Sequence, residues 1–441
     1  MSAQGVARKS WIERLGLQRP ELRAWAMYDW ANSSFWATTI HFFPIYFVSV
    51  ACAGAPGSVG SSRFGWATFI AMLIVAVLAP WLGAIADHTG RKKRLLIVFM
   101  AVGVPAAAAL ALVGRGQWVM GAAIFIVANI GITGSLVFYD SLLPHIAAPG
   151  EVDRVSTAGY ALGYLGSGLL MALNVAWIAK PRAFGLPDQA TAIRLSLLSA
   201  AIWWLAFSLP LIRRVREPAA TGAPTPGVRL WRVGFLRLWR TAHELRRYRQ
   251  AFLLLAAFLF YNDGINTIIR MAVPYGTEVG ISAEALLGAI LLVQFVGVPF
   301  TFLFGMMARR IGAKRAILLG LAVYLVITLI AYSMRTAGEF FALAILVGVV
   351  QGGTQALSRS LFATLIPTAR SAEFFGLFGV SEKFSAILGP GLFALMIDLT
   401  GSGRSALLAI AGFFAIGGVL LARLDVQRGQ AAARASQEGA P

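Results

Sequence analysis

The sequence predicts an all-α polytopic membrane protein with twelve transmembrane helices in two pseudo-symmetric six-helix bundles. Three features lead to this prediction: the composition, the number of long apolar segments and the distribution of basic residues. Of the 441 residues, 58% are apolar and 13% are charged, whereas soluble domains carry about 25% charged residues. Because so few charges would not cover the surface of a water-soluble chain, we expect lipid to surround much of it.

Twelve segments are mostly apolar over about 20 residues, which is the length that a helix needs to span a bilayer. The one long connection, 213–250, divides these segments six and six. They are 26–50, 66–86, 95–113, 118–139, 159–179, 194–212, 251–273, 285–304, 316–334, 339–360, 374–397 and 405–422. The predicted organisation is an N-terminal segment 1–25, a first bundle 26–212, a linker 213–250, a second bundle 251–422 and a tail 423–441.

Basic residues gather on one side of the predicted membrane. An even number of spans puts both termini on the same side, and that side carries 29 of the 38 Lys and Arg residues. The opposite loops carry seven, and Arg270 and Lys383 lie within spans. The positive-inside rule therefore predicts that the termini and the linker are cytoplasmic. The same asymmetry explains the net charge of +19 without nucleic acid as a partner.

The linker combines a flexible stretch with a predicted amphipathic helix. Residues 218–227 are rich in Pro, Gly, Thr and Ala, a composition typical of a flexible segment. Over 228–250, apolar residues such as Trp231 and Trp239 share one helix face, and most of the arginines share the other. Such a helix is expected to lie on the cytoplasmic leaflet, against anionic lipid head groups. The alternative is that these arginines serve membrane topology alone.

Polar and ionisable residues recur inside the predicted spans, where a charged side chain costs about 2.5–3.5 kcal/mol. The first span carries Asp29 and Asn32, and the seventh repeats this spacing with Asp263 and Asn266. Residues at i, i+3, i+4 and i+7 share a helix face, so each span presents a polar stripe that is expected to face a cavity. The residues predicted to line this cavity are Asp29, Asn32, Trp36, Asn129, Asp263, Asn266, Arg270, Gln351, Gln355 and Lys383. The alternative is a hydrogen-bond network that only fixes helix packing.

The two halves repeat one loop pattern. The segment from Gly83 to Arg94 follows the second span, and the segment from Gly305 to Arg315 follows the eighth. Two glycines share their spacing in both segments, and both segments end in basic residues, which an ordinary positive loop would not predict. The first segment resembles the G-x-x-x-D-x-x-G-R-[KR] loop motif of the major facilitator superfamily. This resemblance implies a transporter that holds its substrate between two six-helix halves.

Further runs narrow the resemblance. They are YDWAN at 28–32, GYALGYLG at 159–166, YNDG at 261–264, QALSRSLF at 355–362 and KFSAILGP at 383–390. Together they look like the vacuole-effluxer-like family, whose fungal members are linked to amino-acid efflux from the vacuole. The resemblance thus implies a bacterial branch member with amino acids as the substrate class. One departure is Glu382, which stands where glycine is usual before the lysine and leaves the charge balance around Lys383 open.

The resemblance also implies a cytoplasmic gate. In this fold the loop after span two lies near the start of span eleven, and the loop after span eight lies near the start of span five. Asp87 is therefore expected to meet Arg370, and Arg309 to meet Asp153. The predicted gate residues are Asp87, Arg91, Asp140, Asp153, Arg309, Arg359 and Arg370. The alternative role for Asp87 and Arg309 is to stabilise loop turns.

No enzyme motif is present in the sequence. There is no Walker loop and no His, Cys, Asp or Glu cluster at metal-ligand spacing, so no cofactor and no metal are expected. We expect a monomeric secondary transporter, working by alternating access on a small polar or zwitterionic metabolite in the cytoplasmic membrane of a bacterium. Asp29 and Asp263 are proton-coupling candidates, because burial disfavours the charged form of a carboxyl. Two alternatives stay open: a translocator of lipids or lipid conjugates, and a non-transporting scaffold or receptor.

Overall fold

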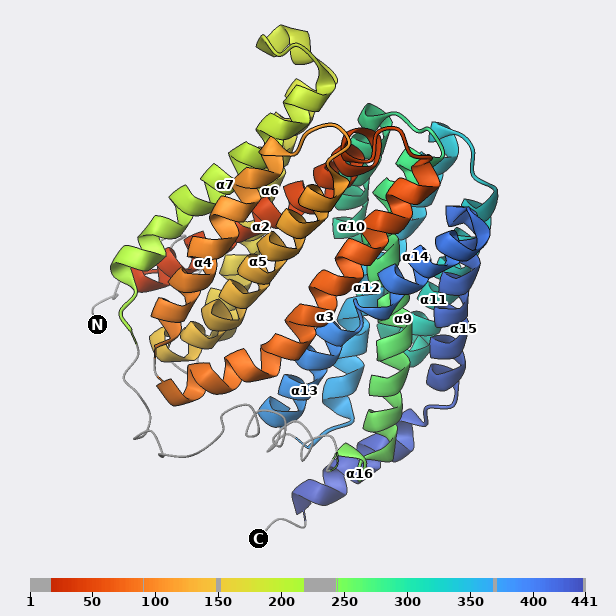
Figure 1. Cartoon of the computed structure of the whole chain (residues 1–441). Coiled ribbons are helices and arrows are strands. Elements are labelled where there is room, and N and C mark those ends of the chain that lie inside the picture. Colours follow the sequence, from red (N-terminus) through yellow and green to blue (C-terminus); the bar gives the residue numbers. More distant parts are fainter. Residues whose placement is uncertain are drawn as a thin grey trace, which may run out of the picture. The chain divides into compact units, whose positions relative to one another are not determined.

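The computed structural model describes residues 17–89, 91–147, 152–217, 243, 245–367 and 371–438, and every regular element within them is a helix (Figure 1). The elements of the first half are α2 (Pro20–Tyr46), η1 (Phe47–Ala51), α3 (Gly57–Thr89), α4 (Lys92–Ala109), η2 (Leu110–Leu112), α5 (Trp118–Ile146), α6 (Val152–Ala179), η3 (Pro181–Phe184) and α7 (Gln189–Arg214). Those of the second half are α9 (Arg249–Glu278), α10 (Ala283–Ile311), α11 (Ala313–Ser333), α12 (Ala337–Thr364), α13 (Ser371–Phe384), α14 (Leu388–Thr400), α15 (Gly403–Ala422) and α16 (Val426–Glu438).

The predicted spans coincide with helices, most of which extend a few residues beyond the predicted ends. Among the described residues, ten helices are long and apolar enough to cross a membrane. The eighth predicted span lies in α10, which contains a shorter apolar stretch, Ala283–Gly297. The eleventh is divided between α13 and α14. The prediction of an all-α polytopic membrane protein is confirmed.

The division of the eleventh span was not predicted. Pro390 favours it, although α2, α4, α7 and α9 each accommodate an internal proline. A continuous helix over 374–397 would need the N–H group that proline lacks, and the proline ring would clash with the carbonyl of residue 386. In the first turn of a helix this N–H group has no intrahelical acceptor, so proline is tolerated there. The chain accordingly interrupts the helix over 385–387 and starts α14 at Leu388, which puts Pro390 in the first turn (Figure 1).

The linker and the C-terminal tail differ in how far the structure describes them. The predicted amphipathic helix 228–250 falls outside the described residues over 228–242 and at 244, and its last two residues open α9. The tail, for which no element was predicted, contains α16. The tail is held to α9 and α11 because the Asp425 backbone N–H donates to Gln250 Oε1 and Lys314 Nζ donates to the carbonyl of Leu424.

The chain forms two compact units. The first unit comprises Met1–Phe43, Trp81–Leu112 and Val127–Leu230, and the second comprises Pro44–Pro80, Val113–Ile126 and Trp231–Pro441. In the first unit α7 packs against α4 and α6; in the second, α9 packs against α15, and α10 against α12. Portions of α3 and α5 therefore belong to the second unit together with the C-terminal half of the chain.

The internal repeat is expressed as a matching pair of buried hydrogen bonds. In the first unit, Tyr28 on α2 donates to Ser135 Oγ on α5 at 2.7 Å. In the second unit, Tyr261 on α9 donates to Ser358 Oγ on α12 at 2.6 Å. The predicted first and fourth spans are thus tied in the same way as the seventh and tenth.

Close packing of α4 and α5 in the first unit depends on two glycines. A Cβ at Gly131 would overlap the Cα of Gly103 and lie 2.7 Å from its backbone nitrogen. We therefore expect Gly131→Ala to push the two backbones apart and to lower stability by about 1–3 kcal/mol, the usual cost of overpacking. Thermal unfolding of the purified protein in detergent measures this loss.

Gly168→Ala on α6 is the matched control, because a Cβ there meets nothing within 4 Å. Alanine favours a helix over glycine by about 1 kcal/mol, so this variant is expected to be as stable as the parent or slightly more so. Equal melting temperatures for the two alanine variants would contradict the close approach of α4 and α5.

Candidate functional site

The polar cluster of the first unit is centred on Asp29, in an unbroken stretch of α2. The Asp29 side chain is 8% exposed and that of Asn32 is 4% exposed. Asn32 Nδ2 donates to the Tyr28 carbonyl at 2.9 Å and lies 3.4 Å from Asp29 Oδ1. On α6, a Cβ at Gly159 would lie 2.9 Å from Asp29 Oδ2, so a glycine lets the carboxylate approach that helix.

Aromatic side chains border this cluster. Trp25 stacks on Tyr139 with ring centroids 4.4 Å apart, and Tyr28 lies against the same ring at 4.8 Å. The Trp25 indole N–H donates to the backbone carbonyl of Tyr139 at 3.1 Å. Trp25 and Tyr139 were not among the predicted site residues, although Trp25 lies one helical turn before Asp29 on the same face of α2.

The polar cluster of the second unit is built on α9, where Asn262, Asp263 and Arg270 are 0%, 2% and 8% exposed. Asp263 Oδ1 accepts a hydrogen bond from the Gly389 backbone N–H at 3.0 Å. Arg270 lies two turns further along α9 and interacts electrostatically with Asp263. A buried carboxylate and a buried guanidinium therefore lie on the same helix.

Amides extend this cluster to α12 and to the interrupted span. Asn262 Nδ2 donates to Ser385 Oγ at 2.6 Å, and Asn266 Nδ2 donates to the Ser385 carbonyl at 3.3 Å. Gln355 Nε2 on α12 donates to Asn262 Oδ1 at 3.1 Å. Four polar residues from α9, α12 and the 385–387 segment therefore form one connected network.

The remaining predicted cavity residues differ in their surroundings. Asn129 is buried on α5, whereas Trp36 on α2 is 36% exposed. Gln351 is partly buried one turn before Gln355 on α12. Lys383 belongs to α13, and its side chain lies outside the described residues. Sequence reasoning missed Asn262, Ser385 and Gly389, because it did not foresee the interruption that brings them together.

The predicted cytoplasmic gate is only partly described. Arg370 lies outside the described residues, and so do the side chains of Asp87, Asp153 and Arg309. Arg91, Asp140 and Arg359 are exposed. The gate stays a prediction.

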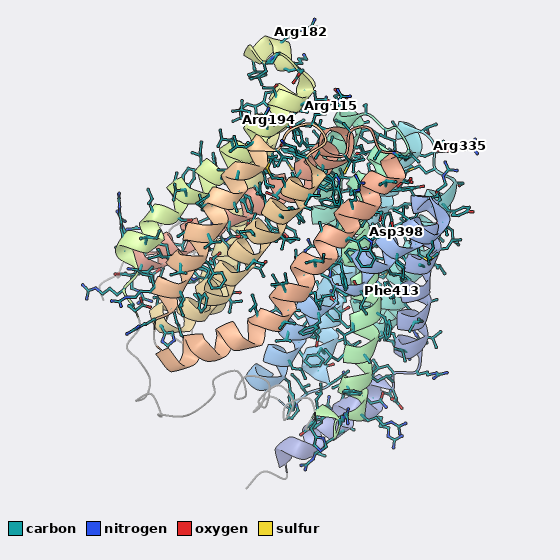
Figure 2. The ribbon with its side chains drawn as sticks, viewed as in Figure 1. Arg115, Arg182, Arg194, Arg335, Asp398 and Phe413 are labelled. Carbon is teal, nitrogen blue, oxygen red and sulfur yellow. The ribbon has the colours of Figure 1, made fainter. Side chains whose placement is uncertain are left out.

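A different set of polar contacts, in the second unit, joins α3 to α9 and α14. Asp398 near the end of α14 accepts hydrogen bonds from Ser62 Oγ and, at 2.7 Å, from the Trp66 indole N–H. Ser61 Oγ donates to the Pro274 carbonyl on α9 at 3.1 Å. Within this unit, Asp398 lies toward the end that carries Arg335, away from α16 (Figure 2). No sequence pattern singled out this acid.

Below these contacts α3 and the 385–387 segment share an apolar core. Ala71, Met72 and Ala76 on α3 pack against Ala386 and Ile387. A Cβ at Gly65 would lie 2.9 Å from both the Ala394 Cβ and the Pro390 carbonyl oxygen, so α3 and α14 approach closely at a glycine. Among the described residues, no group of three or more His, Cys, Asp or Glu side chains suits a metal ion.

Comparison with known proteins agrees with this architecture. The model of the family described as "Vacuole effluxer Atg22 like" matches residues 60–152 and 149–434. The uncharacterised MFS-type transporter YxiO of Bacillus subtilis is 36% identical over 402 residues, which cover 90% of this chain and 93% of that protein. Autophagy-related protein 22-2 of Emericella nidulans is 26% identical over 477 residues, covering 87% and 80% of the two chains.

Among solved structures, a D-xylose-proton symporter matches with a TM-score of 0.67 at 14% identity, covering 95% of this chain and 99% of that one. This likeness concerns the fold alone and confirms the predicted major facilitator architecture. The family match and the bacterial relative confirm the resemblance seen in the sequence runs. This chain belongs to the vacuole effluxer Atg22-like family and is a multi-pass membrane transporter of the major facilitator type.

Proposed function

We propose that this transporter moves a small zwitterionic metabolite, with amino acids as the substrate class, by proton-coupled alternating access. The observation that carries the proposal is the buried polar network of the second unit, in which Asp263 and Arg270 lie inside a membrane-spanning helix. Ionisable groups cost about 2.5–3.5 kcal/mol at the centre of a bilayer. This cost favours a functional role for the buried acid and the buried base.

The chemistry of the pair suits a zwitterion. Arg270 offers a planar fork of N–H donors that matches a carboxylate, and a carboxylate such as Asp263 or Asp29 attracts an ammonium group. The description of the family as vacuole effluxers supports export as the direction of transport. A proton on either acid would provide the coupling ion, because burial favours the neutral carboxyl.

We expect the protein to work as a monomer in the cytoplasmic membrane of a bacterium, with both termini in the cytoplasm. The Bacillus subtilis relative supports a bacterial setting. In the second unit, Arg115 and Arg335 lie at the end opposite α16 (Figure 2), which is the arrangement expected if these two loops face outward.

Arg270→Gln is expected to lower both net transport and exchange of amino acids by about tenfold or more. Loss of a buried, charge-assisted hydrogen bond costs roughly 1.5–3 kcal/mol, and each 1.4 kcal/mol is a factor of ten. Uptake and counterflow of radiolabelled amino acids in proteoliposomes measure the effect. Arg335→Gln is the matched control, because Arg335 is exposed in the connection between α11 and α12, and it should transport normally. If Arg270→Gln protein elutes as a folded monomer and transports every amino acid at the parent rate, Arg270 does not bind the substrate.

Alternating access requires the α3 contacts of the second unit to break during each cycle. The contacts of Ser62 and Trp66 with Asp398 join segments more than 300 residues apart in the chain, and they lie beside glycine-mediated packing of α3 on α14. A hydrogen bond to a charged group contributes about 1.5–3 kcal/mol net, so two such contacts can open and reform during a transport cycle. We assign them to closure on the outer side.

Tethering Ser62 to Asp398 should therefore stop transport. The single cysteine, Cys52, is first replaced by alanine, and Ser62→Cys and Asp398→Cys are then combined. A short bifunctional thiosulfonate reagent should abolish uptake in the double variant, and a reducing agent should restore it. Each single-cysteine variant treated in the same way is the control and should keep its activity. Full transport by the cross-linked protein would rule out separation of α3 from α14 during the cycle.

A further inference from the structure

The interruption of the eleventh span leaves backbone groups that need partners. α13 ends at Phe384 and α14 begins at Leu388, and the three residues between them are buried. The first N–H groups of α14 and the last carbonyls of α13 have no acceptor or donor within their own helices. In a bilayer, water does not supply these partners. The residue that precedes α14, Ile387, has a side chain that cannot cap the helix, and no side-chain capping bond is present there.

Helix α9 contributes a partner on each side of the interruption, beside the local hydrogen bonds that Ser385 and Ile387 donate to the last carbonyls of α13. Asp263 Oδ1 accepts from the Gly389 N–H in the first turn of α14, at 3.0 Å. Asn266 Nδ2 donates to the carbonyl of Ser385, just after the end of α13, at 3.3 Å. Asp263 therefore caps α14 as an N-cap residue would, although it lies 126 positions away in the sequence.

The fit at this contact is close enough to require glycine at position 389. A Cβ there would overlap Thr267 Oγ1 and lie 3.0 Å from Asp263 Oδ1. Thr267 is in turn fixed, because its hydroxyl donates to the Asp263 carbonyl at 2.7 Å. The start of α14 is thus seated on one turn of α9, and its position depends on what the Asp263 carboxyl group accepts.

The charge of Asp263 matters because the N-terminus of a helix carries a partial positive charge. Among the described side chains, Arg270 on α9 is the charged group that interacts with Asp263. On α13, Glu382 is exposed and the side chain of Lys383 lies outside the described residues. Gln355 on α12 is uncharged. Protonation of the Asp263 carboxylate removes its negative charge. Arg270 and the N-terminus of α14 then lose their interaction with that charge.

We propose that Asp263 is a positioning residue that holds the interruption between α13 and α14, and that protonation of its carboxylate releases α14. The proton comes from water on one side and returns to water on the other, and no other bond is made or broken. This inference rests on the proposed function, since it supplies the element through which proton binding would move a span during transport. It also assigns a role to the interruption itself, which acts as a hinge in the eleventh span.

Two substitutions of Asp263 separate the cap from the charge. Asparagine is a good helix cap and takes up no proton, so Asp263→Asn should lose accumulation driven by a pH gradient by about tenfold or more while α14 stays capped. Alanine offers no acceptor, so Asp263→Ala should lose the cap as well as the accumulation. Hydrogen–deuterium exchange measured by mass spectrometry should show faster exchange over 385–392 in Asp263→Ala, and parent-like exchange there in Asp263→Asn.

Asp188→Asn is the matched control. Asp188 is also a helix cap, on α7 in the first unit, and the hydrogen bond from the Thr191 backbone N–H lowers the pKa of its exposed carboxyl. This variant should keep exchange, accumulation and amide protection over 385–392. Parent-like protection in Asp263→Ala would overturn the cap, and proton-driven accumulation in Asp263→Asn would overturn the role of its charge. If the transport rate of the parent protein does not depend on the pH gradient, both the proposed proton coupling and the release of α14 by protonation are wrong. The comparison of amide exchange still tests whether Asp263 caps α14.

Discussion

A bilayer interior offers the backbone no hydrogen-bonding partners, and this constraint decides which polar residues the chain can keep inside its spans. An unbroken helix satisfies its own N–H and carbonyl groups, so most spans of this protein need few polar side chains. The eleventh span is interrupted just before Pro390, a residue that is disfavoured inside a helix and tolerated in its first turn. Ser385 and Ile387 donate to the last carbonyls of α13, and α9 adds Asp263 at the start of α14 and Asn266 at the Ser385 carbonyl. The polar stripe of α9 therefore supplies hydrogen-bond partners to the interruption that precedes Pro390.

The lipid environment also explains why helices of this protein approach one another closely. With little hydrophobic driving force between helices in lipid, association depends on van der Waals packing, and small residues let backbones meet. Gly131 meets Gly103 between α4 and α5, and Gly65 meets Ala394 between α3 and α14. Gly389 serves a different purpose, since it brings a backbone N–H rather than a helix surface against Asp263. Some glycines of this chain thus allow close helix packing, and Gly389 allows a hydrogen bond.

The spans and their polar stripes could be predicted from the sequence, because apolar length and helical spacing are local properties. Asn266 and Gln355 are predicted in this way and lie in one network with Asn262, and the predicted Asp263 accepts from the Gly389 backbone. The interruption was missed because a long apolar run reads as continuous, although Pro390 within it was a usable signal. Asp398 was missed for another reason. Its partners Ser62 and Trp66 lie on a helix that is distant in sequence, and no motif near residue 398 indicates a contact with them. The helix α16 follows the last span and shows no apolar run that would mark it.

The register of the internal repeat distinguishes the two buried acids. The sequence echo pairs Asp29 with Asp263, but the tyrosine–serine hydrogen bonds pair Tyr28 with Tyr261 and therefore Asp29 with Asn262. In that register Asp263 has no acidic counterpart in the first unit. Asp29 lies near an amide from its own helix, so a proton there would disturb only a side-chain contact. Asp263 accepts from the backbone at the start of α14 in the divided span. Of the two acids, Asp263 is accordingly the one whose carboxylate contacts a helix end, and this contact is the reason that we propose Asp263 for the coupling role.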